Sequence, residues 1–183
     1  MAIAMGKHMK RGRSDSLEKD MCAKAMWASV ENAQRFLQDA KTLYAQGRYQ
    51  SAALLGIFAF DEVGKAGLLK WAQTLSLESE KEWTEFWRAF YLHEPKLWFA
   101  NFNAGVSLIA RASGVKKEDL LKYLDRTTKK IHSLREKVAY VDICNGDVER
   151  PKMATKEECR EIFGLVQSVL KRRTFTPQQD TGR

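Results

Sequence analysis

Proline is scarce in this chain. Pro95, Pro151 and Pro177 are the three prolines among 183 residues, so the first half of the chain contains none. Since proline removes a backbone hydrogen-bond donor and clashes with the preceding helical turn, long proline-free stretches permit long helices. No segment shows the alternating, β-branched pattern of a strand. The sequence therefore predicts an all-α fold, an up-and-down bundle of about five to six helices.

The first two predicted helices form a hairpin. Residues 14–16 offer capping side chains for a helix that enters at about Leu17, and apolar residues then recur at steps of three and four. Gly47 ends this helix, because glycine tolerates the left-handed conformation that often follows one. The break is short enough to require an antiparallel return, from about Tyr49 to Leu75. The first half of the return helix is apolar on nearly all sides, which predicts the buried centre of a bundle.

Four further segments follow. We expect a helix from about Glu80 that stops near His93, because Glu94 precedes Pro95, and then a helical segment closed by Gly114. Another helix is expected over about 117–140, followed by a loop with an Asn-Gly turn and a last helix capped by Thr155 in a capping box. The inward positions of the 117–140 helix are predicted to be Leu120, Leu121, Leu124, Ile131, Leu134 and Val138.

Composition predicts one folded domain with basic ends. Hydrophobic residues make up 44% and charged residues 30% of the chain, and its formal net charge is +8. We expect a single helical domain over 17–173, a disordered basic arm over 1–16 and a disordered tail over 174–183. Such a charge makes a polyanion such as RNA a reasonable partner, although solvated basic tails are common in proteins that bind no nucleic acid.

Cysteine usage and hydropathy bear on the compartment. Cys22, Cys144 and Cys159 are odd in number and far apart, which excludes a tidy disulfide framework and favours a reducing compartment. No stretch has the apolar length needed to span a bilayer, and the first residues lack the pattern of a secretory signal. A cytoplasmic protein with no membrane association is expected. His93 with Glu94 is the best metal-ligand cluster and lacks a second ligand at useful spacing, so neither metal nor cofactor is predicted.

Three blocks of sequence resemble the AbiV family of abortive-infection proteins. The stretch ENAQRFLQDAKTLYAQGRYQSAALLGIFAFDEVGKAGLL resembles the family's helical hairpin, ending in an acid-acid-x-Gly-Lys pattern at 61–65. FWRAFYLHEPKL resembles its aromatic stretch followed by a His and a Lys, here His93 and Lys96. LREKVAYVDICNGDVERP resembles its Tyr-Val-Asp loop. The blocks cover about 31–158, and Asp61 departs from the usual glutamate.

The resemblance implies a HEPN-type helical bundle and a role in bacterial defence against phage. HEPN domains are often homodimers, and many active ones cut RNA without metal, using an Arg and a His separated by four to six residues. Others serve as non-catalytic binding modules. Arg88 with His93 fits this spacing, and so does Arg126 with His132. With 13 arginines in the chain, such spacings also arise by chance.

Context favours Arg88 and His93 as the catalytic pair. His93 lies at a helix end before a proline, where the family pattern places its His, whereas His132 lies among charged residues that indicate a solvated face. His93 would transfer protons and Arg88 would hold the phosphate, because RNA supplies the 2′-hydroxyl nucleophile. The expected products are a 2′,3′-cyclic phosphate and a 5′-hydroxyl. Ala89 departs from the polar residue that often follows the Arg in active members.

Further residues are predicted to support this site. Glu62 and Lys65 lie three apart on one helix face beside Asp61, and they are interpreted as a pair that braces the bundle. Tyr140 and Asp142 are expected to fix the loop before the last helix, and Lys96 belongs to the family pattern.

Three functions follow from these observations. One is an antiphage metal-independent endoribonuclease or translation-blocking toxin. The second is a non-catalytic helical module that binds a phage or host protein. The third is an RNA-binding protein driven by its basic tails.

Overall fold

The computed structural model describes residues 16–109, 116–140, 142–144, 147–149 and 151–171. Six helices and one small hairpin follow one another in the described residues: α1 (Lys19–Ala45), α2 (Tyr49–Ala72), α3 (Glu80–Tyr91), α4 (His93–Ile109), α5 (Lys117–Ala139), β1 (Asp142–Cys144), β2 (Asp147–Glu149) and α6 (Lys156–Leu170). The all-α class and the number of helices are confirmed. The predicted basic arm and tail, apart from Ser16, lie outside the described residues.

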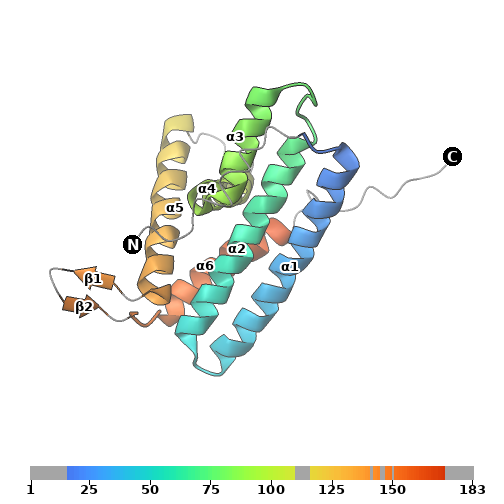
Figure 1. Cartoon of the computed structure of the whole chain (residues 1–183). Coiled ribbons are helices and arrows are strands. Elements are labelled where there is room, and N and C mark those ends of the chain that lie inside the picture. Colours follow the sequence, from blue (N-terminus) through green and yellow to red (C-terminus); the bar gives the residue numbers. More distant parts are fainter. Residues whose placement is uncertain (1–15, 110–115, 141, 145–146, 150, 172–183) are drawn as a thin grey trace.

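The central element is α2, which contacts each of the other five helices. Figure 1 shows α1 and α2 running side by side as a long hairpin, with α6 behind them and α5 on the opposite flank from α1. Most of α2 is buried, including Ile57, Phe60 and Leu68 at 0% exposure. An apolar helix at the centre of the bundle was predicted. A helix that is apolar on all sides is stable only when other helices cover every side, because of the hydrophobic effect.

The turn between α1 and α2 follows the prediction, but the start of α1 does not. Gly47 has φ of 75°, in the left-handed region that a side chain disfavours. The helix begins at Lys19, and its N-cap residue Glu18 makes no side-chain capping bond. The prediction that residues 14–16 cap this helix was therefore wrong.

The boundary between α3 and α4 also differs from the prediction. Leu92 alone separates the two helices, with extended backbone angles of −84° and 141°. His93 is consequently the first residue of α4, and Pro95 lies in the first turn of that helix. Proline is tolerated there because the first N–H groups of a helix have no intrahelical partner. The predicted end at Gly114 lies outside the described residues.

The end of the chain contains a short hairpin and a capped helix. The predicted loop after α5 contains the antiparallel strands β1 and β2, which project from the bundle (Figure 1), whereas no strand was predicted there. The capping box of α6 is confirmed: Thr155 Oγ1 accepts from the Glu158 backbone N–H, and the Glu158 carboxylate accepts from the Thr155 N–H. In α5, Leu124 and Ile131 are buried as predicted, whereas Leu121 is 42% exposed.

Two glycines of α2 let other helices approach its backbone. A Cβ added at Gly56 would lie 2.9 Å from the Ile162 side chain of α6. A Cβ at Gly64 would lie 2.1 Å from the backbone oxygen of Lys96, in the first turn of α4. Since real Cβ atoms do not come so close to other atoms, Gly64 is what allows the start of α4 to lie directly on α2.

Candidate functional site

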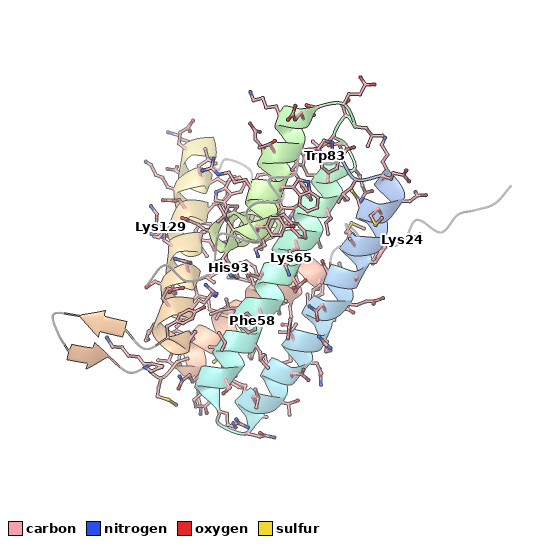
Figure 2. The ribbon with its side chains drawn as sticks, viewed as in Figure 1. Lys24, Phe58, Lys65, Trp83, His93 and Lys129 are labelled. Atoms are coloured by element: carbon pink, nitrogen blue, oxygen red, sulfur yellow. The ribbon has the colours of Figure 1, made fainter. Side chains whose placement is uncertain are left out.

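The His93 imidazole has a polar partner at each of its two ring nitrogens. Its Nδ1 lies 2.5 Å from Oδ2 of Asp61, and its side chain remains 40% exposed. Figure 2 shows His93 beside α2, in the region between α2 and α5. The position follows from the fold: the single extended residue Leu92 places His93 at the start of α4, and Gly64 brings that start against α2. Residues 32 positions apart in the sequence therefore form one hydrogen-bonded pair.

Asp61 is a buried carboxylate that serves two residues of α4. It is 5% exposed, and the same oxygen that contacts His93 lies 3.8 Å from Nζ of Lys96. His93 and Lys96 are three residues apart, so they share one face of the first turn of α4. The other oxygen, Oδ1, is buried and has no hydrogen-bond partner among the described residues. A buried carboxylate requires such partners, because loss of hydration is otherwise not compensated.

The other nitrogen of the imidazole faces an arginine that the sequence did not indicate. Nη2 of Arg135 lies 3.2 Å from His93 Nε2 and also donates to the Tyr140 hydroxyl at 2.8 Å. A guanidinium can only donate, so Nε2 is the accepting nitrogen and the ring proton lies on Nδ1, directed at Asp61. A carboxylate that holds Nδ1–H in this way fixes both the tautomer and the orientation of the ring. The nitrogen with a free lone pair is thereby presented to Arg135.

Lys96 is almost fully buried next to this pair, with 5% exposure. Burial lowers the pKa of Lys96 below its ordinary value of 10.5, and Lys65 and Arg135 lower it further by charge repulsion, while Asp61 and Glu62 oppose the shift. The sequence predicted a supporting role for Lys96, and the structure brings it to within ion-pair distance of Asp61.

Glu62 and Lys65 lie on another side of α2. The two side chains form an ion pair, as their spacing predicted. They line a pocket of about 570 Å³ together with residues of α1, among them Asn32 and Arg35. The residues of the acid-acid-x-Gly-Lys motif therefore have different contacts. Asp61 contacts His93, and Gly64 lies against the start of α4. Glu62 and Lys65 face α1.

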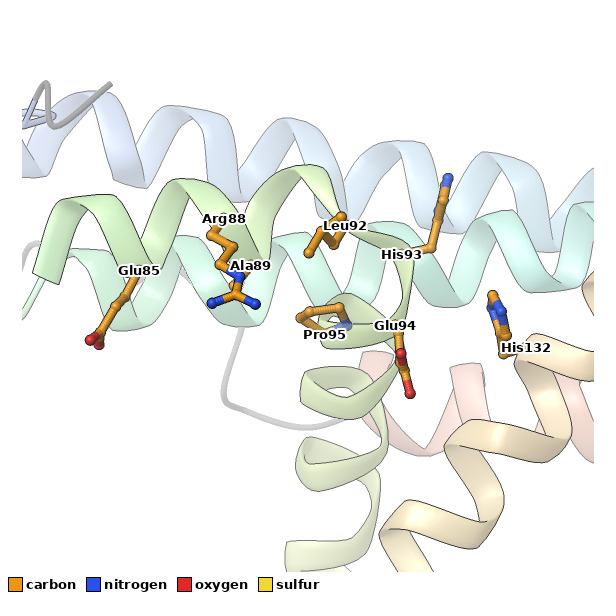
Figure 3. A pocket seen from close by; sticks show the side chains of 8 residues that line it. All are labelled: Glu85, Arg88, Ala89, Leu92, His93, Glu94, Pro95 and His132. Atoms are coloured by element: carbon orange, nitrogen blue, oxygen red, sulfur yellow. The ribbon is translucent and has the colours of Figure 1, made fainter. Parts of the chain in front are cut away.

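Arg88 and His93 line one pocket but do not meet. Figure 3 shows this pocket, of about 520 Å³, with the two side chains pointing in different directions from the end of α3 and the start of α4. The Arg88 side chain makes no hydrogen bond or ion pair with any other residue that the structure describes, although its backbone oxygen accepts from the Leu92 N–H. The arginine beside the imidazole is thus Arg135 and not Arg88.

His132 lines the same pocket from α5. Its Nδ1 is buried without a hydrogen-bond partner within the described part of the chain, so the prediction of a solvated face at this position was wrong. Arg126, its partner in the second motif match, is exposed.

The remaining predicted residues lie after α5. Tyr140 follows the last residue of that helix and contacts Arg135. Asp142 begins β1, and its side chain lies outside what the structure describes. In the described ranges, no three His, Cys, Asp or Glu side chains gather closely enough to hold a metal ion. No helix among the described residues is long and apolar enough to cross a membrane.

Comparison with known protein families defines the class. The model of the AbiV family of HEPN proteins (HEPN_AbiV) matches residues 21–171, from the first turn of α1 to the end of α6. The bundle is therefore of the HEPN type. The chain belongs to the AbiV family, which confirms the resemblance found in the sequence, and a role of the abortive-infection type follows from that membership. No curated protein and no solved structure matches the chain.

Proposed function

We propose that this AbiV-family protein defends bacteria against phage as a metal-independent endoribonuclease, with His93 as the group that transfers protons. The observation that carries the proposal is the geometry of one imidazole. A buried carboxylate holds its Nδ1 at 2.5 Å, its Nε2 faces an arginine at 3.2 Å, and its side chain stays 40% exposed. An oriented, accessible imidazole can transfer protons to and from a phosphodiester, and a neighbouring cation can stabilise the negative charge that develops on it.

The proposed reaction uses the RNA's own nucleophile. His93 Nε2 accepts the proton of a 2′-hydroxyl, the 2′ oxygen forms a bond to phosphorus, and the bond from phosphorus to the 5′ oxygen breaks. The 5′ oxygen leaves with a proton from water, which gives a 2′,3′-cyclic phosphate and a 5′-hydroxyl. Asp61 stabilises the imidazolium that forms when His93 takes the proton. Cleavage of RNA needed for protein synthesis would also make the protein a translation-blocking toxin in the cytoplasm.

Arg88 remains the predicted partner of His93 by spacing. Its guanidinium, which has no partner among the described residues, lines the pocket that His93 also lines, and there it would attract the RNA backbone. A homodimer is part of the proposal, since two copies would supply two such pockets.

The experiment is RNA cleavage by purified protein in the presence of a chelator, with product ends analysed for the cyclic phosphate. His93→Ala should lower the rate by about 10²- to 10⁴-fold, the usual contribution of a general acid–base group. Asp61→Asn should also be slow, because an amide cannot stabilise the imidazolium. Arg126→Ala is the matched control, since Arg126 is exposed on α5 and belongs to the rival Arg/His pair. Equal cleavage by His93→Ala would refute the proposal.

A second candidate is a non-catalytic module that binds a phage or host protein. It is favoured by the engagement of both His93 nitrogens, because a fully hydrogen-bonded histidine can serve the fold alone. Phage infection of cells that carry wild type, Arg88→Ala or His93→Ala separates the two functions. If the variants no longer protect cells from phage and new RNA ends no longer form, the result supports the nuclease. If both variants fold and protect cells fully, the result supports the binding module.

A further inference from the structure

Arg135 is a nearly buried cation with an incomplete set of partners. Its side chain is 11% exposed, and its Nε is buried with no hydrogen-bond acceptor among the described residues. Its ion pair is with the adjacent Glu136, at 3.2 Å, and that carboxylate is half exposed. A pair with a half-exposed carboxylate contributes little, because water screens the carboxylate charge. A buried guanidinium normally has a closer and better-shielded anion.

The buried carboxylates nearby are already committed to other groups. Asp61 contacts both His93 and Lys96, and Glu62 pairs with Lys65. Within the described residues, the cluster around His93 therefore holds the cations Lys96 and Arg135 against one buried carboxylate, Asp61, and the half-exposed Glu136. Charge repulsion from Lys65 and Arg135 also contributes to the lowered pKa of Lys96. Because water screens the Glu136 charge, one cation of the cluster has no buried carboxylate as its partner.

The contact between Arg135 and His93 is a weak one for a guanidinium. It joins a cation to a ring nitrogen at 3.2 Å, and the second hydrogen bond of the same Nη2 goes to a neutral hydroxyl, that of Tyr140. A phosphate oxygen is a much stronger acceptor, and two phosphate oxygens match the fork of a guanidinium. Tyr140 is 48% exposed, so this hydrogen bond joins the guanidinium to a residue at the protein surface.

We propose that Arg135, together with the Tyr140 hydroxyl, forms an oxyanion-binding site beside His93 Nε2 that takes one phosphodiester phosphate of RNA. The phosphate oxygens displace the contact between Arg135 and His93 and accept hydrogen bonds from the guanidinium. The scissile phosphate then lies next to the nitrogen that accepts the 2′-hydroxyl proton. This inference rests on the proposed nuclease function, and it assigns phosphate binding to an arginine 42 residues after His93 instead of to Arg88 alone.

The first test uses the wild-type protein. Inorganic phosphate is titrated into ¹⁵N-labelled protein, and the Nε–H signals of the arginines are followed by NMR, with the Arg135 signal assigned from its absence in Arg135→Lys. We expect a saturable shift of the Arg135 signal and no comparable shift for the exposed Arg126. An Arg135 signal that does not move, or a shift shared equally by Arg126, would overturn the site.

The second test measures binding of a fully 2′-O-methylated RNA, which cannot be cleaved. Arg135→Gln should weaken binding about tenfold, as expected for loss of one charge-assisted contact, and should reduce the salt dependence by about one phosphate contact. Arg126→Gln is the matched control from the same helix and should have a small effect. Because this RNA has no free 2′-hydroxyl, the result is independent of whether the protein cuts RNA.

The two tests separate the sources of the anion. A phosphate-dependent shift of Arg135 without any effect of Arg135→Gln on RNA binding would overturn the assignment to RNA. Thermal unfolding of Arg135→Gln is measured alongside RNA binding to check that the variant folds. If it does not fold, the same RNA is titrated into the wild-type protein, and a shift of the Arg135 Nε–H signal decides whether RNA binds at this site. Failure of cleavage with a normal Arg135 response would refute the nuclease proposal and leave the phosphate site standing.

Discussion

The Gly64→Ala variant directly tests the close approach of α4 to the backbone of α2. The added methyl carbon would lie 2.1 Å from the Lys96 backbone oxygen, 2.6 Å from its carbonyl carbon and 3.0 Å from its Cα. All three atoms belong to the backbone of α4, so no side-chain rotation relieves the overlap. The first turn of α4 must move away from α2.

The expected cost follows from two opposing terms. Overpacking that forces a backbone shift costs about 3 kcal/mol, the upper end of the usual range. Replacing glycine by alanine inside a helix returns about 1 kcal/mol through helix propensity. The net destabilisation is about 2 kcal/mol, which lowers the melting temperature by about 4 to 8 °C in a protein of this size. The displaced turn carries His93 and Lys96, so RNA cleavage should fall as well.

Gly164→Ala is the matched control. Gly164 lies inside α6, and a Cβ there would meet nothing within 4 Å. The propensity term then acts alone, and this variant should gain up to about 1 kcal/mol. Urea unfolding of the two variants and wild type measures both terms. Equal stability of Gly64→Ala and Gly164→Ala would show that α4 does not lie on α2 as described.

Two further predictions concern charge and capping. Thr155→Ala should cost about 1 kcal/mol in urea unfolding. It should also reduce the loss of folding free energy at acid pH. Burial acts to raise the pKa of Glu158, but hydrogen bonds from Thr155 and Lys137 outweigh it, so the pKa lies below its ordinary value of 4.5. The stability that Glu158 contributes is therefore present above pH 4.5 and is lost as the pH falls through the lowered pKa. Burial lowers the pKa of Lys96, so between this lowered pKa and pH 10.5 the unfolded chain binds a proton at Lys96 that the folded chain does not. The free energy of unfolding of the wild type should therefore rise with pH in this window, and Lys96→Met should remove that rise. The difference in unfolding free energy between wild type and Lys96→Met, followed from neutral pH to 10.5, measures it, and a flat difference would contradict the reasoning.

Local sequence patterns were sufficient for most of the helices. The hairpin of α1 and α2 was predicted because helical periodicity and the glycine turn at Gly47 both act over a few residues. The capping box at Thr155 was found for the same reason. The start of α4 was missed because Pro95 was expected to separate the helices, whereas it is accommodated in the first turn of α4.

The candidate site could be predicted only in part. His93 was selected and Asp61 was expected to support its site, because the family pattern includes both. Arg135 was missed, since its contact with His93 spans 42 residues and depends on how α4 and α5 pack. No periodicity distinguishes Arg135 from the other arginines of the chain. The burial of the His132 Nδ1 atom was missed for the same reason, as it depends on the helices that face α5.

The two glycines of α2 at which other helices approach impose a fixed spacing on the chain. Gly56 faces α6 and Gly64 faces α4, and a step of eight positions along the helix places them about 12 Å apart along the axis. Insertion or deletion of one residue between them would rotate one contact by about 100° relative to the other. Either α4 or α6 would then meet a side chain where it now meets bare backbone. Changes in length should therefore be tolerated in the connection at 73–79 and not between positions 56 and 64.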